Sequence, residues 1–214
     1  ALVKPSRRYK CSAAKCLVLP MEHRLKPEIP NPEATEKVST SDLILDAAER
    51  VVARDGAHLT IDAVVKESGF SKGGVLYNFP SKVALIEGMI KRMTGRFLAR
   101  HEEAKARALS DNAPVLPAML CAFFDDKHVD RHVYMGLLAA LAENPELIEP
   151  VRQVHVQMRD DMLAHATDPV LGRIALLASD GLHFAEILGL ETCSPDERRA
   201  IEARLVALVT ESPQ

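Results

Sequence analysis

Apolar side chains recur at intervals of three and four residues along most of the chain from residue 44 onward. In the first such segment charged residues occupy one face, and the apolar residues share the other, namely Ile44, Ala47, Ala48, Val51 and Val52. This period is typical of an amphipathic helix that buries one side. We expect the helix to end at Asp55-Gly56, with Gly56 in the left-handed conformation that often follows a helix C-terminus.

Two short helices follow, separated by a tight turn. Thr60 is a suitable N-cap for the segment "IDAVVKESG", because its hydroxyl can accept hydrogen bonds from free backbone N–H groups. Gly69 is expected to end this segment, and Ser71 can cap the next one directly afterwards. Two short helices joined in this way and packed on a longer first helix predict a helix-turn-helix.

The rest of the chain continues the helical pattern. Ser81 begins the long segment "SKVALIEGMIKRMTGRFLARHEEAKARAL", which turns strongly charged after Phe97, where we expect it to emerge into solvent. Prolines that suit a first helical turn separate later segments. No alternating strand pattern and no internal repeat occurs, so the predicted fold is all-α with about nine helices. The later helices are expected at about 114–125, 129–142, 146–166, 169–189 and 195–211.

Charge is distributed unevenly along the chain, although the formal net charge is only −3. Residues 1–38 are basic and proline-rich, residues 39–92 are neutral, and residues 93–214 carry 12 basic against 19 acidic side chains. If the protein contacts DNA, its N-terminal part must therefore do so. We predict a flexible leader over 1–38, a helix-turn-helix domain over 39–92 and a second helical domain over 93–214.

The first 20 residues leave several interpretations open. They hold five basic residues and no acid. This stretch is either a flexible leader, a segment that precedes a biological start at Met21, or a basic arm that reaches DNA phosphates. A secretory signal is not indicated, because the apolar portion "CLVLP" is too short.

Composition favours a cytoplasmic helical protein. Hydrophobic residues make up 47% of the chain, and only 4% are aromatic. No apolar run reaches the roughly 18 residues of a membrane span, since Asp180, His183 and Glu186 interrupt the longest candidate. The four cysteines form no CxxC motif or regular framework, which indicates a reducing compartment.

The stretch "FSKGGVLYNFPSK" places two glycines inside a predicted helix. Each costs up to about 1 kcal/mol of helix stability relative to alanine. Gly73 and Gly74 are useful if the helix backbone must approach base edges in a major groove about 12 Å wide. Lys72 can reach a guanine or a phosphate, and Tyr77 and Lys82 can donate to phosphates. Ser81 also begins a helix whose N-terminus favours an anion.

Residues 44–90 resemble the DNA-binding region of the TetR family of transcriptional regulators. The resemblance rests on a loose "A-A…G" opening, the second helix "T-I-D-A-V" and the signature S-K-G-x-[hydrophobic]-Y-x-F-x-[SK]-K. Leu76 departs from a position that is often aromatic in the family, and Asn78 from one that is often His. With the residue chemistry above, the resemblance implies a set of DNA-binding residues: Thr60, Ser71, Lys72, Gly73, Gly74, Tyr77, Asn78 and Lys82.

The resemblance also implies that residues from about 93 onward bind a small effector and form a homodimer. Small residues along 172–185 (Gly172, Ala175, Ala178, Ser179, Gly181 and Ala185) suit close helix contacts, so we predict the dimer face on helices 169–189 and 195–211. The alternative is that these small residues pack within one subunit. Methionines and aromatic rings with a few polar groups suit an adaptable apolar pocket. Its candidate walls are Met119, Phe123, Phe124, Tyr134, Met135, Leu138, His155, Met158, Arg159, Met162, His183 and Phe184.

The sequence therefore predicts a ligand-responsive repressor that a small apolar effector releases from a palindromic double-stranded DNA operator. No enzymatic activity, cofactor or metal is predicted, because no nucleophile elbow, phosphate loop or dinucleotide fingerprint occurs. Two alternatives remain. One is a helix-turn-helix DNA-binding protein without a ligand. The other is a metal-dependent helical enzyme centred on His128 and His132, which lacks an evident third ligand.

Overall fold

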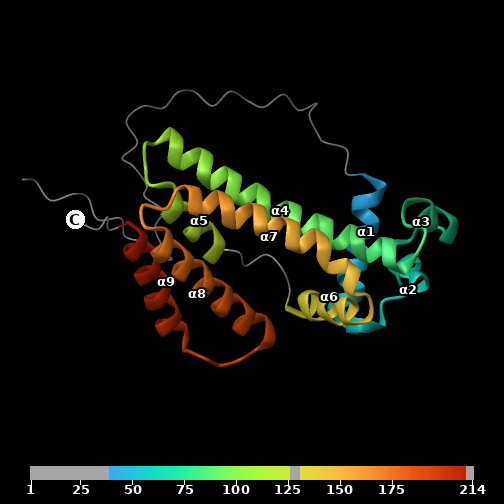
Figure 1. The fold of residues 1–214 in the computed structure, drawn as a ribbon. Helices are drawn as coiled ribbons and strands as arrows, with labels where there is room; N and C mark the ends of the chain where they lie inside the picture. Colours follow the sequence, from blue (N-terminus) through green and yellow to red (C-terminus); the bar gives the residue numbers. More distant parts are fainter. Residues whose placement is uncertain (1–38, 126–130, 211–214) are drawn as a thin grey trace, which may run out of the picture.

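The structure is a computed structural model that describes residues 39–125 and 131–210 of the chain. Over these residues every regular element is helical, which confirms the all-α prediction (Figure 1). The elements are α1 (Thr40–Asp55), η1 (Gly56–His58), α2 (Ile61–Ser68), α3 (Lys72–Asn78), α4 (Lys82–Ser110), α5 (Val115–Phe124), α6 (Arg131–Glu143), η2 (Pro145–Ile148), α7 (Glu149–Ala164), α8 (Pro169–Leu188) and α9 (Pro195–Thr210). The expectations for the basic leader, Met21 and His128 lie outside the described residues.

The helix-turn-helix forms through the caps that the sequence predicts. The hydroxyls of Thr60, Ser71 and Ser81 each accept a hydrogen bond from the backbone N–H three residues later, at 3.0–3.1 Å. Gly69 ends α2 in the left-handed conformation, with φ 74° and ψ 2°. Gly56 differs from expectation, because its φ of 60° is paired with ψ −128°, outside the left-handed helical region. It leads into the short 3₁₀ helix η1 instead.

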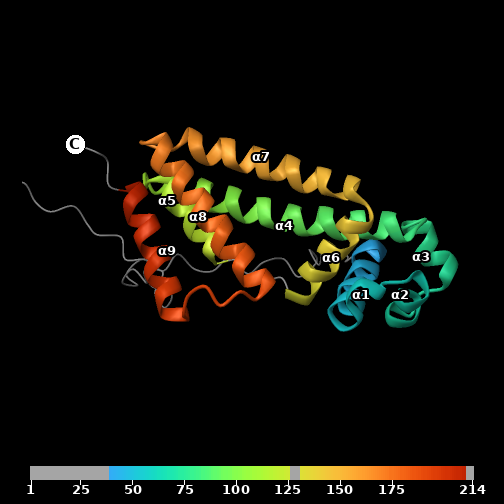
Figure 2. The same ribbon diagram turned by 60° about the horizontal axis from the view of Figure 1, so that its bottom comes forward.

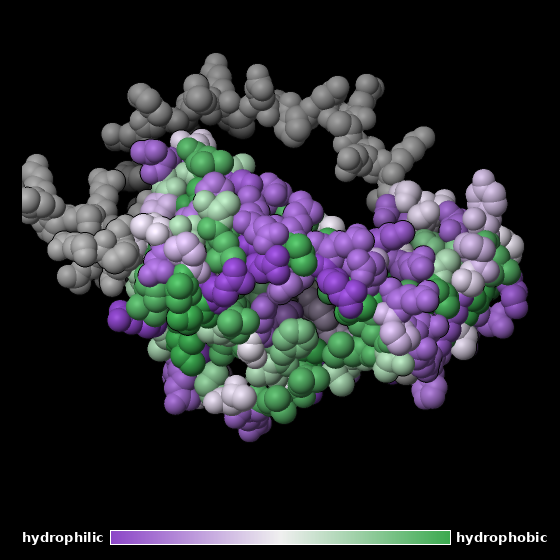
Figure 3. Space-filling model, in the orientation of Figure 1, coloured by the Kyte–Doolittle hydropathy of each residue, from purple (hydrophilic) through white to green (hydrophobic). Residues whose placement is uncertain are grey.

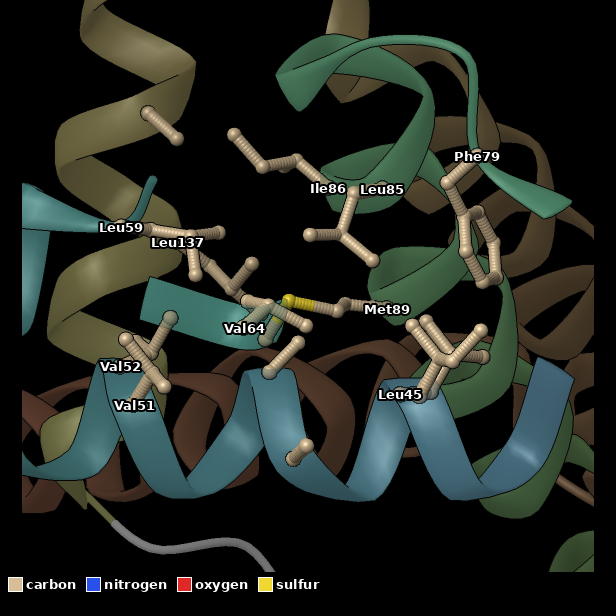
Figure 4. Packing of buried hydrophobic residues seen from close by; sticks show 14 of the residues in the cluster. Leu45, Val51, Val52, Leu59, Val64, Phe79, Leu85, Ile86, Met89 and Leu137 are labelled. Carbon is tan, nitrogen blue, oxygen red and sulfur yellow. The ribbon is translucent and has the colours of Figure 1, made fainter. Parts of the chain in front are cut away.

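The N-terminal core lies between α1, α2, α3 and the first half of α4 (Figure 4). Val75 and Phe79 of α3 and its C-cap are buried in it as predicted, whereas Leu76 is only half-buried. The Phe79 ring fits because Gly88 has no side chain, and a Cβ at Gly88 would lie 2.7 Å from the ring. α3 is therefore held against the core through one side and leaves the other side open.

Arg92 fixes α4 to α1 by charge as well as packing. Its guanidinium group lies 2.7 Å from Asp46 and 2.6 Å from Glu49, and it donates a 3.0 Å hydrogen bond to the Asp42 carbonyl. The Arg92 side chain is only 10% exposed. Asp46 and Glu49 are 43% and 27% exposed, so this largely buried guanidinium is compensated by two carboxylates that remain in contact with solvent.

A second core lies between the distal half of α4 and the helices α5, α7, α8 and α9. The expectation that α4 emerges into solvent beyond Phe97 is wrong. Phe97 packs against this second core, and His101 and Ala108 are buried. α4 and α7 run side by side along the molecule, as Figures 1 and 2 show. Of the charged residues that suggested exposure, Glu102, Glu103 and Arg107 are exposed, whereas Lys105 pairs with Asp161 of α7 at 2.6 Å.

α6 completes the N-terminal core although it lies far along the chain. Val133, Leu137 and Ala140 of α6 are buried against α1 and η1. Gly136 makes this approach possible, because a Cβ there would overlap the Val52 side chain. At the other end of α6, the Arg131 guanidinium donates to the carbonyls of Ile187 and Leu188 at 2.8 and 3.2 Å. α6 thus connects the N-terminal core to the C-terminus of α8.

One predicted helix is divided. The segment expected at 146–166 forms the 3₁₀ helix η2 and then α7, which begins at Glu149. Pro150 falls in the first turn of α7, where it needs no backbone N–H partner. The pattern of apolar positions does not separate a 3₁₀ turn from the α-helix that continues it.

The small residues of α8 do not form its outer face. Gly172, Ala175, Ser179 and Ala185 are buried within the subunit, as the alternative interpretation held. The exposed side of α8 carries large apolar residues instead, and Gly181 lies among them with open space around it. These residues, called the α8 stripe below, are Val170, Ile174, Leu177, Phe184 and Leu188. Figure 3 shows hydrophobic side chains at the surface over α8 and α9.

Within the part of the chain that the structure describes, no helix combines the length and the apolar character needed to cross a bilayer.

Replacing Gly136 by alanine should destabilise the protein, because the new methyl group overlaps Val52 where α6 meets α1. We expect a loss of about 1–3 kcal/mol in the free energy of unfolding, measured by urea denaturation followed by circular dichroism. Gly95→Ala on α4 is the control, since its Cβ meets nothing within 4 Å. Alanine should stabilise that exposed helix position by up to about 1 kcal/mol. Equal stabilities for both variants would contradict tight docking of α6.

Candidate nucleic-acid interface

α2, α3 and the start of α4 lie together at one end of the molecule (Figure 1), and several of their polar residues are exposed. Ser71, Lys72 and Gly73 are exposed, and the Tyr77 side chain reaches 90% exposure. The buried side of α3 anchors this surface through Val75. A large aromatic side chain left so open is unusual for a residue that serves packing within its own subunit.

The capping hydroxyls remain available for a second partner. Thr60 and Ser71 are exposed, and each oxygen already accepts a backbone hydrogen bond. A hydroxyl that accepts one bond can still donate its own proton, for example to a phosphate oxygen. Both residues therefore fit a helix cap and a phosphate contact at the same time.

The two glycines of α3 have different surroundings. A Cβ at Gly73 would meet nothing within 4 Å, so packing inside the subunit does not require glycine there. A Cβ at Gly74 would lie 3.3 Å from the Ser71 hydroxyl, which is tight but not prohibitive. Neither glycine has a positive φ. The bare backbone of α3 is therefore not explained by the fold alone.

Asn78 is engaged inside the subunit. Its amide nitrogen donates to the Gly74 carbonyl at 2.9 Å, and its amide oxygen accepts from the Ser41 hydroxyl at 2.8 Å. These bonds tie the end of α3 to the first turn of α1. A DNA contact from Asn78 stays a prediction, and these two bonds show that the residue also positions α3.

Lys82 lies at the junction between the two halves of the molecule. Its ammonium group is 3.9 Å from the carboxylate of Glu143, the last residue of α6. Lys72 is also paired, with Asp62 of α2 at 2.9 Å. Sequence reasoning identified both lysines but not their acidic partners, because nothing in the local pattern relates residues that are 10 and 61 positions apart.

Aromatic rings from four helices meet in the C-terminal half. The centroid of Phe123 lies 5.7 Å from Phe97 and 5.7 Å from His183, and Tyr134 lies 5.5 Å from His183. Phe184 and Phe124 contact the same group of rings. The structure therefore brings together five of the candidate wall residues, namely Phe123, Phe124, Tyr134, His183 and Phe184.

The other candidate walls divide into two groups. Met119, Met158 and Met162 are buried in the second core. Met135 and His155 are exposed, Leu138 is half-buried on α6, and Arg159 pairs with the neighbouring Asp160 at 2.7 Å. The sequence predicted the helices that carry these residues, but it could not show which side of each helix faces inward.

Met119, Met158 and Met162 are each no more than 2% exposed. A shallow surface depression lies elsewhere, lined by Leu116, Thr167, Asp168, Leu171, Leu208 and Val209. It encloses no space for a ligand and includes none of the predicted walls.

Asp180 is a polar group near the rings that sequence reasoning did not select. Burial raises the pKa of its carboxyl above the ordinary value, and the neighbouring His155 and His183 offset part of that increase. A carboxylate held where its charge is unfavourable is a common feature of binding sites. The sequence signal was its position one turn before His183 and Phe184 on α8.

Among residues 39–125 and 131–210, no three His, Cys, Asp or Glu side chains are placed to hold one metal ion. His132 lies within this range and His128 does not, so the HxxxH pair is described only in part.

A helix-turn-helix with an exposed recognition helix, joined to a second helical core, defines a class of DNA-binding regulators. Comparison with known families agrees. Residues 44–89 match the family described as bacterial regulatory proteins, tetR family, and residues 113–210 match the tetracyclin repressor-like C-terminal domain. The chain belongs to the TetR family of transcriptional regulators.

Solved structures of similar fold support the same assignment. A TetR-family member from Streptomyces coelicolor A3 is 23% identical over 76% of this chain and 95% of its own, with a TM-score of 0.59. The multidrug binding protein EbrR, complexed with imidazole, is 26% identical over 83% of this chain and 98% of its own, with a TM-score of 0.56. A transcriptional regulator from Rhodococcus sp. Rha1 has a TM-score of 0.61 at 19% identity, over 80% and 96% of the two chains. No curated protein matches the chain.

Replacing Asp180 by asparagine should stabilise the protein at pH 7. Since the folded pKa of the carboxyl lies above the unfolded one, the native state holds its proton longer, and stability falls as pH rises between the two values. The amide does not titrate, so the variant should lack that fall, and its advantage should grow from acid to neutral pH in thermal denaturation. Glu186→Gln is the control, because this exposed carboxylate on α8 is paired with Arg198 and should give no such gain.

Proposed function

We propose that the protein is a repressor that binds a palindromic operator as a homodimer in the cytoplasm and leaves it when a small apolar effector binds. The observation that carries the DNA-binding part is the surface of α3. Packing within the subunit does not require a glycine at position 73, and the side chains of Lys72 and Tyr77 on the same short helix are exposed. Such a surface suits a backbone that must approach base edges.

The proposed contacts follow from the chemistry of each side chain. Thr60, Ser71, Tyr77 and Lys82 have donors that suit phosphate oxygens, which position a protein on DNA without reading its sequence. Lys72 at the start of α3 is placed for base edges. Asn78 supports α3 from behind through Ser41 and Gly74.

Dimerisation through α8 and α9 is supported by the α8 stripe. Together with Gly181, its residues recur at three- and four-residue intervals over the length of the helix, the spacing that pairs helices along a seam. Gly181 falls in the same row and allows a partner helix to approach closely. A homodimer would present two recognition helices to the two halves of a palindrome, which one short helix could not read alone.

Effector binding is proposed at the rings around Phe123, Tyr134 and His183, with Asp180 nearby. EbrR, a similar protein, is described as a multidrug binding protein complexed with malachite green and with ethidium. In this chain the surrounding methionines are packed. An effector would therefore enter only as these side chains rearrange, and it would favour a conformation different from the one described.

A second candidate function is DNA binding without any effector. The burial of Met119, Met158 and Met162 favours it, because these candidate walls are not open to solvent in this conformation. Asp180 favours the ligand-responsive proposal, since folding alone gains nothing from a half-buried carboxylate whose charge is poorly solvated.

Lys82→Ala should weaken binding to every DNA duplex several-fold, because it removes one phosphate contact. The slope of log affinity against log salt should fall by about 1, measured by fluorescence anisotropy on the selected operator and on random DNA. Tyr77→Ala should likewise lower the affinity for both the selected operator and random DNA. Lys91→Ala is the control, because this exposed lysine lies about 14 Å further along α4. Unchanged titrations for Lys82→Ala and Tyr77→Ala would refute their phosphate roles.

Leu177→Glu should separate the dimer, because it places a charge in the middle of the α8 stripe. Sedimentation velocity should show a monomer with unchanged helical content, and operator affinity should fall by at least tenfold. Leu109→Glu is the matched control, since this leucine is similarly exposed at the end of α4, outside the stripe. A dimer that persists in Leu177→Glu would place the subunit contact elsewhere.

A further inference from the structure

The candidate DNA surface carries an ion pair that the fold itself does not require. The ammonium group of Lys72, the first residue of α3, lies 2.9 Å from a carboxylate oxygen of Asp62 in the first turn of α2. Their side chains are 60% and 75% exposed. Exposed ion pairs of this kind contribute little to folding stability. α2 and α3 are already held together by the turn and by the buried side chains beneath them.

An exposed carboxylate on a DNA-binding face restricts how that face can dock. Phosphates repel Asp62, so it weakens any arrangement in which the pair lies along the DNA backbone. At the base edges the situation is reversed, because cytosine presents an amino group that a carboxylate can accept from. Asp62 therefore favours a docked position in which the pair faces the floor of the major groove.

We propose that Lys72 and Asp62 together read one G·C base pair, with Lys72 on the guanine and Asp62 on the cytosine. This inference rests on the DNA-binding function proposed above. In the major groove, guanine O6 and cytosine N4 are hydrogen-bonded to each other at about 2.9 Å. The ammonium and carboxylate groups have the same separation. The ammonium donates to O6 and the carboxylate accepts from N4, so the four groups form a closed ring of hydrogen bonds.

The arrangement also discriminates against the other base pairs. A reversed C·G pair would set the ammonium against the N4 amino group and the carboxylate against O6, so both contacts become repulsive. A T·A pair offers the acceptor O4 and the donor N6 in the correct order. However, guanine provides a second acceptor, N7, for the ammonium, where thymine has a methyl group. G·C in one orientation is thus the best complement.

The experiment is enrichment of a random duplex library by the full chain at constant salt, for the wild type, Asp62→Asn and Lys72→Met. The wild type should enrich a palindrome with a G·C pair at one position in each half-site. Inverting that pair should weaken wild-type binding about 10- to 100-fold, and Asp62→Asn binding by less than threefold, since an amide can both donate and accept. Both variants should lose preference at that same position and keep it elsewhere.

Glu67→Gln is the matched control. Glu67 is also an ion-paired acid on α2, but its partners are Arg50 and Arg54 of α1. This variant should select the wild-type operator. All variants should show the wild-type circular dichroism spectrum, because the substituted side chains are not in the core.

Three outcomes would overturn the inference. If Asp62→Asn keeps the wild-type preference at every position, the carboxylate does not read bases. If the two variants lose preference at different positions, the residues do not share a base pair. In both cases the wild type still selects an operator, so the proposed function stands. If the wild type enriches no sequence, the proposed function fails and this inference fails with it.

Discussion

The structure depends on one helix that serves two hydrophobic cores. The first half of α4 buries Leu85, Ile86 and Met89 among α1, α2 and α3, and its second half packs against α5 and α7. A single rigid helix therefore fixes how the recognition helix is oriented relative to the second core. The Arg92 network with Asp46 and Glu49 prevents α4 from rotating independently of α1.

α6 provides a second connection between the same two regions. It is anchored to the end of α8 through Arg131, packed on α1 through Gly136, and ends beside Lys82 at Glu143. These contacts form a continuous physical path from the proposed dimer helix to the proposed DNA contacts. A change in the packing around α8 would shift α6, and with it both the core beneath α3 and the carboxylate next to Lys82.

The sequence predicted most of the architecture because local signals agreed with the global fold. Capping hydroxyls at Thr60, Ser71 and Ser81 and the break at Gly69 located the helix-turn-helix almost to the residue. Contacts between distant segments were not predictable in the same way. The Asp62–Lys72 pair, the Arg131 anchor and the burial of α4 beyond Phe97 depend on how helices meet in space, and no local period carries that information.

The α8 helix illustrates the same limit. Its small residues suggested a close contact, and they do make one, but within the subunit around Ala175 and Ser179. The sequence showed where the small residues fall along α8 but not which side of the helix faces its own core. In the candidate site, residue chemistry identified the lysines, the tyrosine and the glycines of the DNA surface. It did not identify Asp180, because its position one turn before His183 became meaningful only once the fold had brought the other rings to that histidine.

The α8 stripe has a consequence for how the protein would work at different cellular abundances. If the stripe joins two subunits, then in dilute conditions the amount of binding-competent protein rises with the square of the number of chains made. Operator occupancy would then respond to synthesis more steeply than a monomeric regulator could. A small change in expression would switch the regulated promoter over a narrow range.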